Sequence, residues 1–477
     1  MRKLNFALFL CVPGMLWGQR PAMVPVKEPA VVYAPELVHE LETLREAALS
    51  SEYAYQQVAY LTENIGARPT GSPQADAAAH HVMDTLRQAG LDARLEQVVV
   101  PHWVRGAETA ELAAWPGQTP GTIQKVVVTA LGGSTATAPE GLTNEVVVVR
   151  SFDELKALGK DKVAGKIVLF NVKFDTRKAA GGHWRDAYGE AVQYRGQGAK
   201  AAAELGAAAS LVRSVGGADY RIPHTGYSVP AGIPAGAVSA EDAELISHLA
   251  QQGTVRLHLT LTPQLLPEVP GYNVVADLKG REHPEQVVIV SGHLDSWDLG
   301  TGAIDDAAGV AIAMDAVQLM ARLHLHPRRT VRVVAWMNEE SGLRGGTGYA
   351  KAHAGELANH VAAIESDRGA GHPMGFNAKI SAAALPQLEP LEKILATFGA
   401  NVLSVSSEEV EADISPMAEA GVPTFGIMQD GRTYFNYHHT PADTLDKIVP
   451  HELQENVAAA AVLAYALANL PEPLPRQ

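Results

Sequence analysis

The side chains with the most evident chemistry lie in residues 291–306, which contain His293, Asp295, Asp305 and Asp306. Imidazole nitrogens and carboxylate oxygens bind divalent metals, and the glycines between them leave the backbone free to bring them together. An apolar run precedes this stretch and a long helical pattern follows it, which is where open α/β sheets bind ligands. We expect His293 and Asp305 to begin a two-metal hydrolytic site.

More carboxylates and a histidine follow three other predicted strands. They are Glu339 and Glu340 after residues 330–337, Asp367 after 361–366, and His439 after 423–428. Parallel strands place their carboxyl ends at one edge of a sheet, so these groups are expected to meet. Two histidines and three carboxylates, one of them bridging, would hold two ions. Ligands without thiolate favour zinc, with manganese and cobalt as alternatives.

Each of these residues also has a simpler interpretation. Asp305 and Asp306 could cap the helix that follows them, since aspartate is favoured before a first turn. Asp367 could form a surface salt bridge with the next residue, Arg368. The two adjacent glutamates could be solvated. Directly after an apolar strand, however, they would be costly to bury without a cation, which favours the metal site. His438 is interpreted as a wall residue beside the better ligand, His439.

The elements that must position these groups alternate between strand and helix. Strands are predicted at 272–278, 287–291, 330–337, 361–366 and 423–428, and helices at 75–90, 307–323, 348–354, 388–398 and 451–470. This alternation predicts an α/β fold, with a mostly parallel (mixed) sheet covered by helices on both faces. Residues 108–262 differ in character, because alanine, glycine and valine dominate there. We expect a small β-rich or α/β insert, with a helix at 198–205.

The composition excludes several classes of protein. The chain has 477 residues, 47% hydrophobic and 19% charged, which is typical of a globular protein with two or three domains. Its formal charge of −15 argues against a nucleic-acid partner, which would need a basic surface. After the N-terminus no apolar run is long enough for a membrane span.

The N-terminus has the pattern of a secretory signal. Arg2 and Lys3 precede a short apolar run, and cleavage is expected near Gly18-Gln19. We therefore predict a signal peptide over residues 1–18 and a secreted or periplasmic protein. Cleavage would also remove Cys11, the only cysteine, so the mature chain would have no disulfide.

The motifs resemble a known family. The set His293-x-Asp295, Asp305-Asp306, Glu339-Glu340, Glu365-Ser-Asp367 and His439-Thr-x-x-Asp443-Thr is similar to that of the two-zinc aminopeptidase family of metallo-exopeptidases. The resemblance divides the chain into a catalytic peptidase domain at 36–107 and 263–470, and a protease-associated-like β-rich insert at 108–262. It also suggests a homodimer.

The resemblance implies a role for each residue. Asp305 would bridge both Zn²⁺ ions, His293 and Asp367 would complete one site, and Glu340 and His439 the other. Glu339 would act as the general base. Asp295 would orient His293, as carboxylates behind metal-bound histidines do.

The expected activity is metal-dependent hydrolysis of dipeptides or short peptides. Two alternatives stay open: glutaminyl cyclase or N-deacylase chemistry on the same fold, and a non-catalytic peptide-binding module. Two ions per chain would disfavour a one-zinc cyclase, and an intact Glu339 argues against a binding module.

Overall fold

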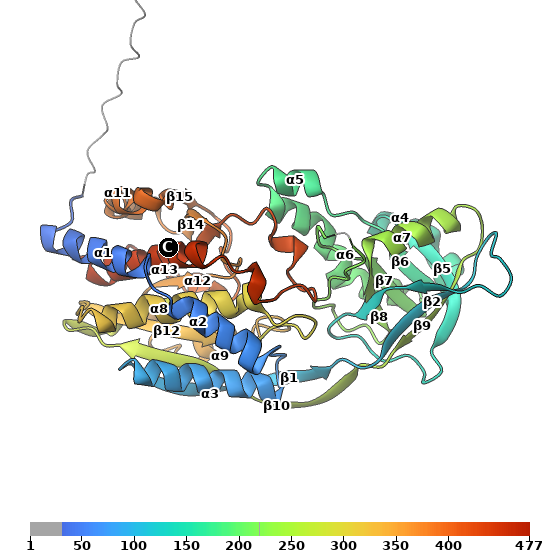
Figure 1. Cartoon of the computed structure of the whole chain (residues 1–477), viewed down its shortest axis with the longest axis horizontal. Coiled ribbons are helices and arrows are strands. Elements are labelled where there is room, and N and C mark those ends of the chain that lie inside the picture. Colours follow the sequence, from blue (N-terminus) through green and yellow to red (C-terminus); the bar gives the residue numbers. More distant parts are fainter. Residues whose placement is uncertain (1–30, 219) are drawn as a thin grey trace, which may run out of the picture.

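The structure is a computed structural model that describes residues 31–218 and 220–477 (Figure 1). The predicted signal peptide at 1–18 lies outside the described residues. Two eight-stranded sheets dominate the molecule. Within the described part of the chain, no helix is both long and apolar enough to cross a membrane.

The first sheet carries the ends of the strands on which the predicted site depends. In spatial order its strands are β1 (Asp92–Val104), β10 (Gln264–Leu278), β12 (Arg329–Trp336), β11 (His283–His293), β13 (His360–Glu365), β16 (Thr424–Gln429), β14 (Pro373–Lys379) and β15 (Val402–Val405). The four central strands, from β12 to β16, run parallel, whereas β1, β10 and β14 introduce antiparallel pairs. All residues of β12 and β13 are buried, as expected for strands covered on both faces.

Helices cover both faces of this sheet. They are α1 (Pro35–Ala48), α2 (Tyr53–Ala59), α3 (Pro73–Gln88), α8 (Ala308–Arg322), α9 (Arg344–Ala352), α10 (Leu385–Leu388), α11 (Leu391–Leu395), α12 (Ser415–Glu419) and α13 (Pro450–Asn469). Along β10, Val274 and Ala276 join the core beneath α3, α8 and α13, whereas Val275 packs with Tyr349 of α9 and Met417 of α12. The predicted α/β fold with a mixed sheet is confirmed.

The sequences of two helices that pack on the first sheet explain why these helices form. In α3, the Ser72 side chain accepts a hydrogen bond from the backbone N–H of Ala75, and Pro73 occupies the first turn. In α8, all residues from Ala308 to Met320 are buried, so the helix is enclosed by the protein on every side. The turn Ala303–Ala307 (η2) leads into α8 and carries Asp305.

The second sheet is built from residues that lie between β1 and β10 in the sequence. Its strands are β3 (Gln124–Val126), β2 (Glu108–Ala114), β9 (Arg256–Leu261), β5 (Leu142–Val149), β6 (Ile167–Phe170), β7 (Ala209–Arg213), β8 (Ala235–Val238) and β4 (Val128–Ala130), with helices α4 (Phe152–Val163), α5 (Thr176–Ala180), α6 (Trp184–Glu204) and α7 (Ala240–Ala250). The long strands β1 and β10 pair with each other and extend from the first sheet toward the second (Figure 1). The protease-associated-like assignment and the boundaries 108 and 262 stay predictions.

Three helices differ in their bounds from those predicted. The helix predicted at 198–205 is the last part of α6, which begins at Trp184. The helix predicted at 388–398 is interrupted, because Pro390 lacks an N–H and separates α10 from α11. The helix predicted at 348–354 begins at Arg344.

Candidate active site

The site residues stand where the parallel strands of the first sheet end. His293 is the last residue of β11, Glu339 and Glu340 follow β12, and Asp367 follows β13. His439 comes from the loop after β16. Because β12, β11, β13 and β16 are adjacent and parallel, their carboxyl ends lie at one edge, as the sequence predicted.

Asp305 lies between the two histidines. Its Oδ1 is 3.2 Å from Nε2 of His293, and its Oδ2 is 3.1 Å from Nε2 of His439. Each histidine faces one further carboxylate: His293 Nε2 is 3.2 Å from Oδ1 of Asp367, and His439 Nε2 is 2.9 Å from Oε2 of Glu340. The five side chains therefore form two clusters that share Asp305.

The donor atoms of these clusters fit divalent metal ions. The ligand atoms of Asp305, Glu340 and His439 all lie within 4.8 Å of one another. Glu340 Oε1 is buried and has no hydrogen-bond partner among the residues that the structure describes. Buried carboxylates need a compensating charge, and nitrogen and oxygen donors suit zinc.

The pKa shifts of the side chains in this site also indicate a place for a cation. Burial raises the pKa of Glu340 to about 7, with the Asp305 carboxylate adding to the increase. Burial also raises the pKa of Glu339 well above its ordinary value. Burial by itself lowers the pKa of His293, but the carboxylates of Asp367 and Asp305 outweigh it and hold that pKa well above its ordinary value. A bound cation would reverse these shifts, because it favours ionised carboxylates and neutral imidazoles.

Asp306 binds mainly to the backbone. Its Oδ2 accepts a hydrogen bond from the N–H of His293 at 3.0 Å, and its Oδ1 accepts one from Gly309 at 2.9 Å. Asp306 also lies within a group of potential ligands that includes His293 and Asp367. Its two backbone contacts match the capping interpretation, and they hold the end of β11 against the start of α8.

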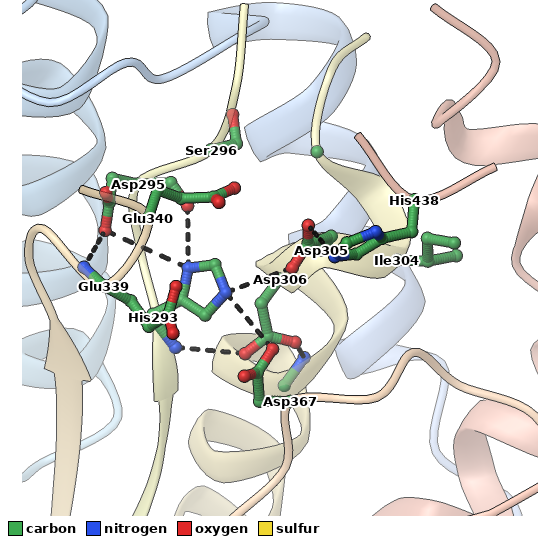
Figure 2. A network of polar contacts seen from close by, with 12 residues as sticks. His293, Asp295, Ser296, Ile304, Asp305, Asp306, Glu339, Glu340, Asp367 and His438 are labelled. Atoms are coloured by element: carbon green, nitrogen blue, oxygen red, sulfur yellow. Dashed lines mark hydrogen bonds and ion pairs between the residues drawn. The ribbon is translucent and has the colours of Figure 1, made fainter. Parts of the chain in front are cut away.

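Asp295 was expected to orient His293 through its carboxylate, but its backbone oxygen makes the contact. His293 Nδ1 lies 2.9 Å from the backbone oxygen of Asp295 and 3.9 Å from its Oδ1 (Figure 2). The carboxylate instead accepts hydrogen bonds from the N–H groups of Asn338 and Glu339, at 2.7 and 3.1 Å, and from Thr70 Oγ1 at 2.7 Å. Asp295 therefore orients the histidine through its carbonyl and fixes the backbone of Glu339 through its side chain.

The loop at residues 224–226, from the second-sheet region, holds His439. The N–H of Thr225 donates to the carbonyl of His439 at 2.9 Å, and His439 Nδ1 lies 3.3 Å from the oxygen of Thr225. A metal-binding histidine typically donates its other N–H to such an oxygen. His439 has a positive φ of 58°, an uncommon conformation that these contacts stabilise.

His438, which the sequence suggested as a wall residue, contacts the cluster directly. Its ring stacks on that of His439, and its Nε2 is 3.4 Å from Oδ2 of Asp305. Its Nδ1 lies 3.0 Å from Nε2 of His224, which is fully buried and comes from the second-sheet region. The buried Arg195 also reaches the site, with Nη1 3.3 Å from His439 Nδ1. The sequence analysis missed His224 and Arg195, because no motif links them to the predicted metal ligands.

Comparisons with known proteins agree with this geometry. Residues 273–464 match the model of peptidase family M28. Carboxypeptidase Q of Homo sapiens is 37% identical over 430 residues, which cover 89% of this chain and 87% of that protein. Carboxypeptidase Q of Xenopus laevis is also 37% identical, with the same coverage.

Solved structures show the same fold. The crystal structure of a peptidase M28 precursor from Shewanella amazonensis superposes with a TM-score of 0.86 at 37% identity, and the match covers 93% of this chain and 99% of that one. A zinc aminopeptidase from Bacillus subtilis, at 20% identity, has a TM-score of 0.62 over 86% of this chain and 94% of its own. The chain therefore belongs to peptidase family M28 and is a metal-dependent exopeptidase.

Proposed function

We propose that this enzyme holds two zinc ions and hydrolyses dipeptides or short peptides. His293 and Asp367 would bind one ion, Glu340 and His439 the other, and Asp305 both. The position of Asp305 carries the proposal, since its two oxygens face two histidines at 3.2 and 3.1 Å. A carboxylate that only capped a helix would not need a histidine on each oxygen.

Each group in the site has its own role in the proposed reaction. When bound, the ions supply Lewis-acid activation of a water molecule and polarisation of the scissile carbonyl. Glu339 takes the proton of the attacking water and delivers it to the leaving amine. Asp295 keeps Glu339 in place through the hydrogen bond from the Glu339 N–H.

We also infer that the chain is exported and that it forms a homodimer. Export follows from the basic and apolar N-terminal pattern with cleavage near Gly18-Gln19. The dimer is inferred from the resemblance to carboxypeptidase Q. Sedimentation of the mature protein measures its oligomeric state, and a purely monomeric species would contradict the dimer.

The two-ion proposal is tested by metal analysis of the purified mature chain. We expect about two zinc ions per chain, loss of dipeptide hydrolysis after chelation, and recovery with zinc, cobalt or manganese. One ion per chain without dipeptide hydrolysis would favour the cyclase-type alternative. Full activity in metal-free protein would reject the mechanism.

The substrate class is tested with dipeptides and with peptides blocked at either end, with product masses as the readout. Cleavage that needs a free amino terminus indicates an aminopeptidase, and cleavage that needs a free carboxyl terminus indicates a carboxypeptidase. A requirement for both indicates a dipeptidase. Binding without cleavage of any of these peptides would favour the non-catalytic alternative.

A further inference from the structure

Two buried histidines connect the second-sheet region to the cluster, although neither is among the five proposed ligands. Nε2 of His224 lies 3.0 Å from Nδ1 of His438, which is a hydrogen-bond distance. Nε2 of His438 lies 3.4 Å from Oδ2 of Asp305, and Figure 2 shows these two side chains beside each other. The two rings therefore form a continuous polar path from the second-sheet region to the carboxylate that the two clusters share.

Aromatic rings fix the plane of the His438 imidazole. The ring stacks on that of His439, with centroids 3.6 Å apart and an angle of 17° between the planes. The rings of Tyr188 and Phe435 meet it edge-on, at 5.6 and 5.1 Å between centroids. Because these rings enclose the imidazole, its two nitrogens keep their directions, one toward His224 and the other toward Asp305.

The carboxylate of Asp305 determines which nitrogen of His438 carries the proton. Without a proton, Nε2 would direct its lone pair at an anionic oxygen, whereas an N–H at this position is attracted to it. A dication bound beside Asp305 would keep the imidazole neutral, and a neutral imidazole has a single N–H. A proton on Nε2 therefore leaves Nδ1 of His438 as an acceptor, so the donor in the contact between the two rings must be Nε2 of His224.

The surroundings of His224 agree with this assignment. Its Nδ1 is buried and has no hydrogen-bond partner within the described part of the chain. A proton on Nδ1 would be a buried donor without an acceptor, and such N–H groups are rare in proteins. The carbonyl of Thr225 is already contacted by Nη1 of Arg195 and by Nδ1 of His439, both at 3.3 Å. His224 is therefore expected to carry its proton on Nε2.

The three histidines at 224, 438 and 439 lie close enough together to hold a metal ion of their own, but their surroundings disfavour one. Nε2 of His439 already faces the carboxylates of Asp305 and Glu340, at 3.1 and 2.9 Å. Nη1 of the buried Arg195 lies 3.3 Å from Nδ1 of His439. Three neutral imidazoles would bring no negative charge to balance a dication beside this guanidinium. Hydrogen bonding therefore explains the contact between His224 and His438 better than a third ion does.

We propose that His224 and His438, the histidine pair, are positioning residues for the bridging carboxylate. His224 donates to His438, and His438 in turn directs its Nε2–H at Oδ2 of Asp305. This inference rests on the proposed two-ion function, and it adds residues outside the ligand set that fix the bridge. A carboxylate oxygen has two lone pairs, so Oδ2 can accept this N–H and still bind an ion. Because Oδ2 faces His439, the pair should act mainly on the ion of Glu340 and His439.

The first test reads the positions of the protons directly. Nitrogen NMR spectra are recorded on zinc-loaded wild-type protein with isotopically labelled histidines, since imidazole nitrogens with and without a proton have distinct chemical shifts. Signals are assigned by their loss in His224→Gln and His438→Gln. We expect both rings to carry a proton on Nε2 and none on Nδ1. A proton on Nδ1 of either ring, or a bond from zinc to Nε2 of His438, would overturn the proposal.

The second test compares two amides at position 438 by zinc titration against a competing chelator. Glutamine can place an N–H near the position of Nε2, whereas asparagine reaches only the position of Nδ1. We expect His438→Asn to weaken one of the two zinc dissociation constants about 10–100-fold, and His438→Gln to stay close to the wild type. His248→Asn is the matched control, because His248 is exposed on α7 of the second-sheet region. Equal losses in both variants would indicate ring packing alone, and no loss in either would also refute the pair.

His224→Leu tests the more distant member of the pair, because it removes the donor and leaves His438 unchanged. We expect the same zinc dissociation constant to weaken, and the signals of His438 to show a mixture of protons on Nδ1 and Nε2. A packing defect would not redistribute that proton. Thermal unfolding of the metal-free variants shows whether they are folded. A folded His224→Leu protein with wild-type zinc affinity and a single His438 tautomer would contradict the proposal.

These outcomes differ from those that test the function itself. If the wild type binds two zinc ions and cleaves dipeptides, but the variants at 224 and 438 do not follow the expected pattern, the histidine pair fails and the peptidase function stands. If the proton positions and zinc affinities follow the pattern but no peptide is cleaved, the peptidase function fails and the pair stands.

Discussion

Glu339 and Glu340 are adjacent in sequence but have different surroundings. Glu340 places an oxygen 2.9 Å from His439, as a ligand of the same ion would, whereas the backbone of Glu339 is held by Asp295. We expect Glu339→Gln to retain its zinc and lose about 10²–10⁴-fold in kcat, because an amide cannot accept the proton of water. Steady-state kinetics together with metal analysis check both parts.

A matched control for this prediction is Glu392→Gln, an exposed glutamate on α11. It should leave both kcat and zinc content unchanged. If Glu339→Gln lost zinc as well as activity, Glu339 would be a ligand rather than a base. Unchanged turnover in Glu339→Gln would remove it from the chemistry altogether.

The proposed metal ligands could be suggested individually because they lie in recognisable motifs at the ends of apolar strands or in the loops that follow them. The residues that support them could not. His224 and Thr225 are more than 200 positions from His438 and His439, and their contacts depend on how the two sheet regions meet. The role of the Asp295 carboxylate was also not visible, since its partners at Asn338 and Glu339 belong to another strand.

At the scale of elements, β13 contains a buried histidine that should make stability depend on pH. His360 Nδ1 lies 3.1 Å from the oxygen of Glu356, and its Nε2 lies 2.8 Å from the hydroxyl of Tyr349, which in turn accepts a hydrogen bond from Arg332. This network suits a neutral imidazole. Burial lowers the pKa of His360 from 6.5 to about 4.

The sign of the effect follows from proton binding. Below pH 6.5 the unfolded chain binds a proton at His360 that the folded chain does not bind, so stability falls until the pH reaches about 4. Between pH 7.5 and 4.5, this residue should cost the wild type about 2–3 kcal/mol. In His360→Gln, the loss of unfolding free energy between pH 7.5 and 4.5 should be smaller by about 2–3 kcal/mol. Urea unfolding of chelated protein measures this difference. Parallel pH curves for the two proteins would contradict the prediction.

Elements with strong local signals were predicted well, and those set by packing were not. The helix α3 has a serine cap and a proline in its first turn, and the observed bounds agree with the prediction to within two residues. In α6, by contrast, Gly189, Gly196 and Gly198 lower the intrinsic helix propensity, so only its end was predicted. Gly198 is needed there, because a Cβ would lie 2.9 Å from the ring of Phe170.

At the scale of the whole molecule, the second-sheet region takes part in the catalytic centre. Arg105, between β1 and β2, donates two hydrogen bonds to Asp298 in the loop after β11 and one to Thr225 Oγ1. The same loop of the second-sheet region contacts His439. The position of this region should therefore affect the metal-binding site, although all five proposed ligands come from the first sheet and its loops.

Gly226→Ala tests this coupling. Gly226 has a φ of 133°, and a Cβ there would lie 2.5 Å from the guanidinium carbon of Arg195 and 2.7 Å from Nδ1 of His439. The substitution should displace the imidazole and weaken zinc binding about 10–100-fold, as loss of a group that orients a ligand typically does. Gly232→Ala is the matched control, since Gly232 also has a positive φ but a Cβ there would meet no described atom within 4 Å. Zinc titration of both variants separates the effect of contact with His439 from the effect of backbone strain. Equal zinc affinities in the two variants would mean that backbone strain alone, rather than contact with His439, determines how the loop affects zinc binding.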